Sequence, residues 1–260
     1  MSLSVEHTGP VAFVTIDRPD VHNAFNGELV DGLMNTFTQL GNDSATRVIV
    51  LGGTGKSFCA GADLQWMRGS LNATQSENQQ NAMLLAEMYE AIDSCPKPVL
   101  ARIQGAAIGG GCGLAAVCDV VVAGPRARFG LSEVRLGLAP AVISPYVVRK
   151  IGKSHARHLF LSGARIDAAH AFRIGLVHLI AENDLELDEL VISTTEQLLK
   201  GGPSAQAECK MLARFADEYT DAGPKTAEVI ARLRVGDEGQ EGMLAFLEKR
   251  PAEWLGSDTE

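Results

Sequence analysis

The sequence predicts an α/β core built on a largely parallel sheet, followed by a helical C-terminal part. Up to about residue 142, short apolar segments alternate with longer segments whose apolar residues recur at helical spacing. Strands that alternate with helices of ten or more residues favour right-handed βαβ units. Beyond residue 142 the strand signals nearly vanish, except for VHLI at 177–180, and helical patterns dominate. At 260 residues and 46% hydrophobic, the chain is long enough to bury a sizeable core.

The N-terminal elements follow from their apolar patterns. Two short strands, 4–8 and 11–17, flank a Gly-Pro turn and predict a hairpin. Segment 27–40 predicts a helix with one apolar face, made of Leu29, Val30, Leu33, Met34, Phe37 and Leu40. Residues 46–53, 98–104 and 119–124 predict buried strands. Segment 76–95 predicts a second long helix, whose inward residues are expected to be Met83, Leu84, Met88 and Ile92.

Helical patterns fill most of the C-terminal part. The expected helices cover residues 143–152, 154–163, 167–175, 187–201, 204–219 and 241–250. Those after Leu185 are amphipathic, which is consistent with buried association surfaces.

Composition excludes several classes of protein. The net charge is −9, and the 23 Lys and Arg residues form no basic block, so nucleic acid is not an expected partner. The five cysteines contain no C-x-x-C pair, which indicates reduced thiols in a cytoplasmic compartment. The N-terminus lacks the pattern of a signal peptide, and no apolar run has the length of about 20 residues that a membrane span needs. We therefore expect a soluble cytoplasmic protein without membrane association.

Glycine-rich segments raise two nucleotide-binding alternatives. The stretch GGTGKS at 52–57 is not a phosphate loop, because that motif needs a glycine where position 50 is valine. Gly111, Gly113 and Ala116 satisfy G-x-G-x-x-A after a strand, as in dinucleotide-binding folds. However, the acidic residue that should end the next strand is missing, since Glu133 lies beyond segment 119–124. The dinucleotide interpretation is therefore disfavoured.

Two glycine-rich turns, FCAGADL at 58–64 and IGGGCGL at 108–114, each stand between an expected strand and an expected helix. Small residues at such turns let backbone N–H groups at a helix start face an incoming oxygen, which builds an oxyanion site without side chains. Two turns from neighbouring strands can aim at one point. The alternative is that these are only tight turns that allow close helix packing.

Five motifs, in order, resemble the crotonase superfamily of enoyl-CoA hydratases and isomerases. They are RPDVHNAFN, GKSFCAGADL, IQGAAIGGGCGLAAVCDVVVAG, ARFGLSEVRLGLAP and QEGMLAFLEKR, and they cover nearly the whole chain. The resemblance implies a crotonase spiral of ββα units over residues 1–195 and a C-terminal helical trimerisation region over 196–260. It also implies a homotrimer or a hexamer built as a dimer of trimers.

The resemblance also implies the substrate and its binding residues. An acyl-CoA thioester is expected to place its carbonyl oxygen between the backbone N–H groups of Ala62 and Gly110. Coenzyme A enters as part of the substrate, and no metal or redox cofactor is implied. The residues expected to contact coenzyme A are Val21, His22, Ala24, Ala60, Asp63 and Leu64, with Phe246 and Lys249 reaching it from a neighbouring subunit. Two alternatives stay open: Asp63 as a helix cap, and Lys249 as an exposed helix charge.

Catalysis is expected to depend on Glu133. Common hydratases of the family hold the attacking water between two glutamates, and the resemblance places one at Glu133 and the other at the position of Gly113. Only one catalytic carboxylate is therefore expected here. A single carboxylate can run syn hydration of a 2-enoyl-CoA thioester, or it can shuttle a proton in Δ3,Δ2-enoyl-CoA isomerisation. A thioester-binding protein without catalysis is the third possibility.

The finer resemblance concerns the acyl group. Gly113, the stretch 131–152 and the ending 239–250 resemble bacterial methylglutaconyl-CoA and isohexenylglutaconyl-CoA hydratases of leucine and acyclic terpene breakdown. Such substrates carry a second carboxylate. A glycine at 113 would spare it like-charge repulsion, and Arg135 or Arg149 is expected to pair with it. The alternative for Arg135 is a surface or interface ion pair.

Overall fold

The computed structural model describes residues 2–215 and 222–255 and contains two sheets. The larger sheet has the strand order β1-β2-β3-β5-β7-β10 and is parallel apart from the β1–β2 hairpin. Its strands are β1 (Leu3–Thr8), β2 (Val11–Ile16), β3 (Val48–Gly53), β5 (Val99–Ile103), β7 (Val120–Ala123) and β10 (Leu179–Ile180). The predicted α/β class with a largely parallel sheet is confirmed.

A second, smaller sheet has the order β4-β6-β8-β9. Its strands are β4 (Ser57–Cys59), β6 (Ala106–Ile108), β8 (Arg128–Gly130) and β9 (Arg165–Asp167). The first three are parallel, and β9 runs antiparallel to β8. The two glycine-rich turns leave this sheet at the ends of β4 and β6, so its pairing brings them together.

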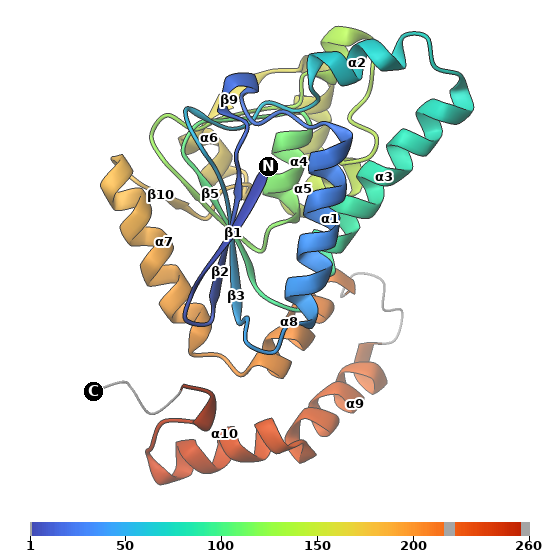
Figure 1. Cartoon of the computed structure of the whole chain (residues 1–260). Coiled ribbons are helices and arrows are strands. Elements are labelled where there is room, and N and C mark those ends of the chain that lie inside the picture. Colours follow the sequence, from blue (N-terminus) through green and yellow to red (C-terminus); the bar gives the residue numbers. More distant parts are fainter. Residues whose placement is uncertain (1, 216–221, 256–260) are drawn as a thin grey trace.

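Helices cover both faces of the larger sheet (Figure 1). On one side, α1 (Gly27–Asn42) packs against α3 (Gln75–Asp93), and α1 buries the predicted apolar face except Met34, which is partly buried. On the other side, α7 (Asp184–Leu199) buries Leu187 and Val191 against Leu100 and Val122 of the strands. The sheet therefore lies between two apolar layers.

The inward face predicted for the second long helix is half wrong. Met88 and Ile92 are fully buried, but Met83 is 52% exposed and Leu84 is 38% exposed. The N-terminal half of α3, which starts at a capping box on Thr74, extends past α1 and away from the sheets (Figure 1). Its apolar residues consequently have no layer to pack against.

Six further helices connect the two sheets and surround the glycine turns in the part of the chain that the structure describes. They are η1 (Pro19–Val21), α2 (Leu64–Ser70), α4 (Gly110–Val117), η2 (Glu133–Leu136), α5 (Ser144–Ser162) and α6 (Ala168–Arg173). Helix α5 joins the two expected helices 143–152 and 154–163, and Gly152 interrupts it with a φ of 74°.

The chain ends in α8 (Pro203–Phe215), α9 (Ala222–Val235), α10 (Asp237–Glu248) and η4 (Glu253–Leu255). Helices α9 and α10 lie below the sheets, apart from the main body (Figure 1). The predicted helix 204–219 is present as far as residue 215, and its positions 216–219 lie outside the described residues. The boundary at 195/196 falls within α7 and stays a prediction. Across 2–215 and 222–255, no helix combines the length and apolar character of a membrane span.

Candidate active site

The two glycine turns are in direct contact. Gly61, with a φ of +90°, lies so close to the second turn that an added Cβ would be 2.9 Å from the Ile108 carbonyl oxygen and 3.6 Å from the Gly110 nitrogen. The contact follows from the parallel pairing of β4 with β6, which ends both strands at the same edge. Two segments that are distant in the sequence thus form one backbone surface.

The Ala62 N–H group is left free by the pairing of its neighbours. The Phe25 N–H donates to the Gly61 carbonyl at 2.7 Å, and the Asp63 N–H donates to the Phe25 carbonyl at 2.8 Å. Because successive peptide groups point to opposite sides of an extended segment, the Ala62 N–H faces away from Phe25. It donates to no described residue, and Ala62 is exposed.

The Gly110 N–H is free for a different reason. Gly110 is the first residue of α4, and the N–H groups of a first helical turn have no partner within the helix. Gly109 precedes it with a φ of 53° and donates its own N–H to the Gly130 carbonyl at 2.8 Å. Among the described residues nothing accepts the Gly110 N–H. Two adjacent free donors are the geometry of an oxyanion hole.

Close packing also requires these glycines. A Cβ on Gly111 would lie 2.1 Å from the Cys59 carbonyl oxygen, and a Cβ on Gly110 would lie 2.6 Å from the Phe25 ring. Both distances are far below van der Waals contact. The packing interpretation and the donor interpretation of IGGGCGL are therefore compatible.

Glu133 lies beside the second turn. It begins η2, and its Oε1 would be 3.1 Å from a Cβ placed on Gly109. The residue is half-buried, and its Oε2 is fully buried with no hydrogen-bond partner among the described residues. Burial raises the pKa of Glu133 above its ordinary value. A carboxyl group with a raised pKa next to an oxyanion hole is suited to proton transfer.

Gly113 is covered by an apolar side chain. A Cβ there would lie 2.4 Å from Ile143 Cγ2 and 3.1 Å from Tyr89 Cε1, and Ile143 is 4% exposed. A side chain at position 113 would therefore meet Ile143. The expectation that Gly113 spares a substrate carboxylate from repulsion stays a prediction.

Most of the residues expected at coenzyme A lie together. Segments 21–25 and 60–64 run side by side, since the Ala60 N–H donates to the His22 carbonyl at 3.0 Å. Ala24 is buried there, and its carbonyl accepts from the Arg18 guanidinium. Val21 and Leu64 are exposed at the edges of this surface.

Asp63 has a structural role in the site. Its side chain caps α2 by accepting from the Gln65 N–H at 2.8 Å, and it forms an ion pair with Arg18 at 2.9 Å. The Gln65 hydrogen bond, followed by the contact with Arg18, lowers the pKa of the Asp63 carboxyl group. The helix-cap alternative for Asp63 is confirmed.

Backbone strain is concentrated before Phe25. His22 and Asn23 have φ values of 55° and 58°, in the left-handed region. The buried Asn23 side chain donates to the carbonyl oxygens of Thr54 and Ser57, and His22 Nδ1 lies 3.0 Å from Ser57 Oγ. These bonds hold the segment that pairs with the first glycine turn. The role of Asn23 was not predicted.

Phe246 and Lys249 lie away from the glycine turns. They stand at the end of α10, below the sheets, and Phe246 is 83% exposed (Figure 1). Within one chain they are not brought to the other expected contacts. Their contact with coenzyme A bound to a neighbouring subunit stays a prediction.

The two arginines expected to pair with a substrate carboxylate differ. Arg149 forms an ion pair with Asp93 and stands over the Tyr146 ring, 5.5 Å from its centre. It is therefore already engaged. Arg135 is exposed in η2, two residues after Glu133, and no described carboxylate pairs with it. Of these two arginines, only Arg135 is free to pair with a substrate carboxylate.

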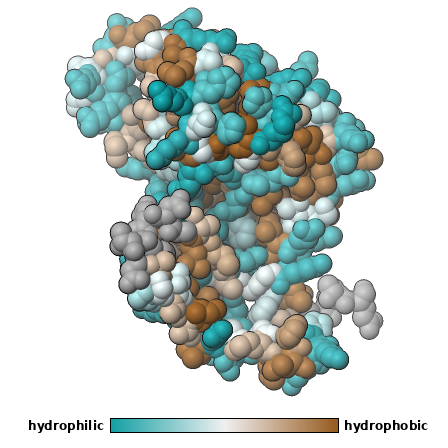
Figure 2. All heavy atoms as spheres, turned by 180° about the vertical axis from the view of Figure 1, so that it is seen from behind, coloured by the Kyte–Doolittle hydropathy of each residue, from teal (hydrophilic) through white to brown (hydrophobic). Residues whose placement is uncertain are grey.

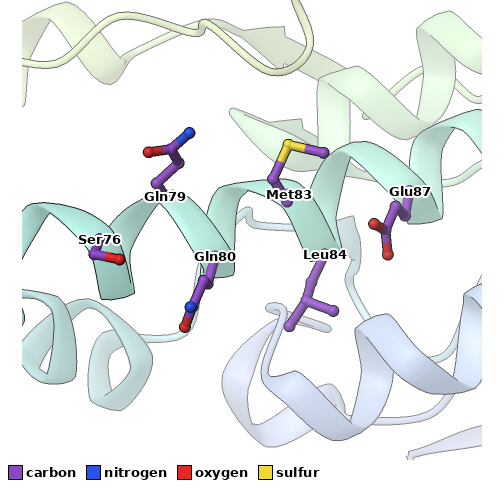
Figure 3. Close-up of a pocket in the computed structure, with 6 residues that line it drawn as sticks. All are labelled: Ser76, Gln79, Gln80, Met83, Leu84 and Glu87. Atoms are coloured by element: carbon purple, nitrogen blue, oxygen red, sulfur yellow. The ribbon is translucent and has the colours of Figure 1, made fainter.

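A separate hollow of about 390 Å³ lies along the exposed half of α3. Figure 3 shows Gln79 and Met83 pointing to one side of the helix and Gln80 and Leu84 to the other. The lining residues include no residue of the expected site. The hollow reflects the same unpacked half of α3 that exposes Met83 and Leu84.

Comparison with known proteins identifies the family. Residues 6–257 match the family model described as enoyl-CoA hydratase/isomerase. The chain belongs to this family. A relative named 2,3-dehydroadipyl-CoA hydratase, from Escherichia coli (strain K12), is 34% identical over 258 residues, which are 98% of each chain. The predicted crotonase superfamily is thereby confirmed, and the chain is an enzyme of the enoyl-CoA hydratase/isomerase family.

Solved structures of the family agree with the fold. A crystal structure of an enoyl-CoA hydratase from Shewanella pealeana has a TM-score of 0.93 and 38% identity, covering 98% of this chain and 96% of that one. AtuE from Pseudomonas aeruginosa has a TM-score of 0.94 and 35% identity, covering 98% and 100%. The closer likeness to methylglutaconyl-CoA hydratases stays a prediction.

Three side chains at the site were not predicted to have roles there: Phe25, Tyr89 and Ile143. Phe25 stands in the motif RPDVHNAFN, and its position next to the coenzyme A residues was the available signal. Tyr89 is a polar group within the apolar face of a helix, which indicates a buried hydroxyl with a partner. For Ile143, the sequence shows only that an apolar residue stands at the start of a helix.

Proposed function

We propose that this chain is an enoyl-CoA hydratase that adds water to the 2,3 double bond of a 2-enoyl-CoA thioester. The observation that carries the proposal is the position of the Glu133 carboxylate against Gly109, directly beside the free Gly110 N–H. The family match and the relatives named as hydratases support it.

The two free N–H groups would bind the thioester oxygen. As water adds at C3, negative charge moves to this oxygen and forms an enolate, which accepts hydrogen bonds from Ala62 and Gly110. A preorganised donor of this kind contributes about 3 kcal/mol to stabilising a transition state. Because both donors belong to the backbone, they need no reorganisation as the charge develops.

Glu133 would transfer both protons. Its carboxylate takes a proton from water while the water oxygen bonds to C3. The resulting carboxylic acid then gives that proton to C2 of the enolate, which restores the carboxylate and completes the addition of one water. One acid on one face of the substrate gives syn addition. General acid–base catalysis by one such group contributes about 10²- to 10⁴-fold.

A second candidate function is Δ3,Δ2-enoyl-CoA isomerisation. Ile143 supports it, because it fills the place at Gly113 where a second carboxylate would help to hold water. In this reaction Glu133 takes a proton from C2 of the 3-enoyl thioester, which forms the enolate, and returns it to C4, so that the double bond moves to C2–C3 and no water is added.

One assay separates the two candidates. Purified protein is incubated with 2-enoyl-CoA and 3-enoyl-CoA thioesters, and the masses of the products are measured by mass spectrometry. Hydration of the 2-enoyl substrate adds the mass of one water, whereas isomerisation of the 3-enoyl substrate leaves the mass unchanged. The variant Glu133→Gln should lose at least about 100-fold in kcat. The matched control Glu6→Gln, on the exposed face of β1, should keep wild-type activity, and equal activity of both variants would contradict the proposal.

For the acyl group, we propose a branched or glutaconyl-type 2-enoyl-CoA whose second carboxylate pairs with Arg135. The exposed, unpaired guanidinium near Glu133 supports this, as does the relative named for 2,3-dehydroadipyl-CoA, a thioester with a second carboxylate. Arg135→Ala should raise KM for 3-methylglutaconyl-CoA and leave KM for crotonyl-CoA unchanged. A wild type that hydrates crotonyl-CoA much faster than 3-methylglutaconyl-CoA would refute the substrate assignment.

We also propose that the chain assembles as a homotrimer or as a hexamer made of two trimers. The C-terminal helices expose many apolar side chains, and Figure 2 shows brown apolar areas among hydrophilic ones on the lower part of the molecule. These side chains include Met211, Ile230, Val235, Met243, Leu244, Phe246 and Leu247. Exposed apolar area of this kind is typical of an association surface. Light scattering of the purified protein measures the assembly, and a monomeric mass would contradict it.

A further inference from the structure

We propose that Phe25 and Tyr89 are positioning residues that fix the two N–H donors relative to each other. The inference rests on the proposed oxyanion role of Ala62 and Gly110. Neither ring provides a donor to the thioester oxygen in this scheme. Their effect is exerted through the backbone of the two turns.

Phe25 contacts both turns at once. Its main chain bonds to Gly61 and Asp63, on either side of Ala62, at 2.7 and 2.8 Å. Its ring packs against Gly110, where an added Cβ would lie 2.6 Å from Cε2 and 3.1 Å from Cδ2. Phe25 is 2% exposed, so this one residue sets the spacing between the two donor peptides from the interior.

Tyr89 holds the second turn from α3. Its hydroxyl donates to the Gly110 carbonyl at 2.8 Å, and its ring meets the Phe25 ring edge-on, with centres 6.4 Å apart and an angle of 88°. The residue is 1% exposed, and burial raises the pKa of its hydroxyl well above the usual range, so the group stays a neutral donor. A buried hydroxyl needs an acceptor, and the only one that it reaches among the described residues is the Gly110 carbonyl.

The two rings therefore link the donors through a rigid path. Ala62 is held by the Phe25 main chain, Phe25 packs on Gly110 and Tyr89, and Tyr89 bonds to Gly110. Oxyanion stabilisation depends on donors that are already in place when charge develops, and displacements of about 1 Å in a site can cost about 100-fold in rate. Loss of the Tyr89 hydroxyl should consequently weaken polarisation of the thioester without removing a substrate contact.

The test is Tyr89→Phe, which removes one oxygen atom and keeps the ring. The matched control is Tyr146→Phe, since Tyr146 belongs to the same aromatic cluster but directs its hydroxyl to Glu90, at 3.4 Å. With the preferred 2-enoyl-CoA, Tyr89→Phe should lower kcat by about fivefold or more and change KM by less than about twofold. Circular dichroism and thermal unfolding are used to check that both variants are folded.

A spectroscopic measurement separates positioning from a general loss of stability. A conjugated thioester such as cinnamoyl-CoA absorbs at longer wavelength when an oxyanion hole polarises its carbonyl. Measured in the Glu133→Gln background, which slows turnover, the red shift should be smaller with Tyr89→Phe and unchanged with Tyr146→Phe. An unchanged red shift and kcat in Tyr89→Phe would overturn the inference, as would equal losses in the control. Failure of the wild type to hydrate any 2-enoyl-CoA would instead refute the proposed function.

Discussion

Replacing Gly113 by alanine tests how tightly Ile143 fills the site. The new Cβ would lie 2.4 Å from Ile143 Cγ2 and 3.1 Å from Ile143 Cβ. Favourable carbon–carbon contacts are about 3.5–4.0 Å, so α4 and Ile143 must separate by more than about 1 Å. Ile143 precedes α5 directly and is 4% exposed, which leaves its side chain little space to turn aside.

Two effects of opposite sign determine how Gly113→Ala changes the free energy of unfolding. Alanine in place of a glycine inside a helix stabilises by about 1 kcal/mol, whereas overpacking a filled core costs about 1–3 kcal/mol. Gly113→Ala alone should therefore lower the free energy of unfolding by up to about 2 kcal/mol. Ile143→Ala alone should cost about 2–5 kcal/mol, because it leaves a cavity. In that background the Gly113→Ala methyl group no longer meets Cγ2 of residue 143, while the Cβ at position 143 and Tyr89 Cε1 stay 3.1 Å away, so the substitution should cost less than in the wild type.

Urea unfolding of the wild type, both single variants and the double variant measures this coupling. Gly32→Ala in α1 is the matched control, since its Cβ would meet only Leu3 Cδ2 at an ordinary 3.7 Å. The control should stabilise the protein with or without Ile143. Additive effects of Gly113→Ala and Ile143→Ala would refute the packing argument. They would also mean that a glutamate side chain could fit at position 113.

Three further outcomes are expected. Burial raises the pKa of Glu133 in the folded protein above its ordinary value of 4.5. The protonated Glu133 therefore contributes its full stability below pH 4.5, and this stability is lost as pH rises through the raised pKa of the folded state. Glu133→Gln should therefore unfold at higher urea concentration than the wild type at pH 8 and at the same concentration at pH 4; identical midpoints at pH 8 would contradict the desolvation. Gly111→Ala should reduce both stability and kcat, measured by unfolding and by hydration rate, because its Cβ meets the Cys59 carbonyl at 2.1 Å; wild-type values would show that the turns can separate freely. Asp63→Ala should cost about 1 kcal/mol of stability in urea unfolding through the lost cap, and Asp63→Asn should retain most of it; equal losses would assign the effect to the Arg18 ion pair instead.

The larger sheet and its helices could be predicted because their patterns are long. Segment 27–40 has an apolar face at helical spacing, and it forms α1. The strands of the smaller sheet could not be predicted in the same way, because β4, β6, β8 and β9 have three residues each and show no alternation. Yet this sheet brings the two glycine turns together.

The candidate site was predictable where motifs mark it. Ala62, Gly110 and Glu133 were expected from motifs, and the structure brings Gly61 against Gly110 and Glu133 against Gly109. The side chains behind them were not expected, since Ile143 reaches Gly113 only through the packing of α5 on α4. Met83 and Leu84 show the converse: helical periodicity identifies an apolar face but does not say where the neighbouring layer ends.

The short pairing of β4 with β6 also has a consequence for folding. It joins two segments that are distant in the chain, and contacts of high sequence separation form late because loop closure must precede them. The two N–H donors come together only when this pairing is complete. Recovery of catalysis during refolding should consequently lag behind the return of helical circular dichroism, so the enzyme's own activity reports on one of its slowest long-range contacts.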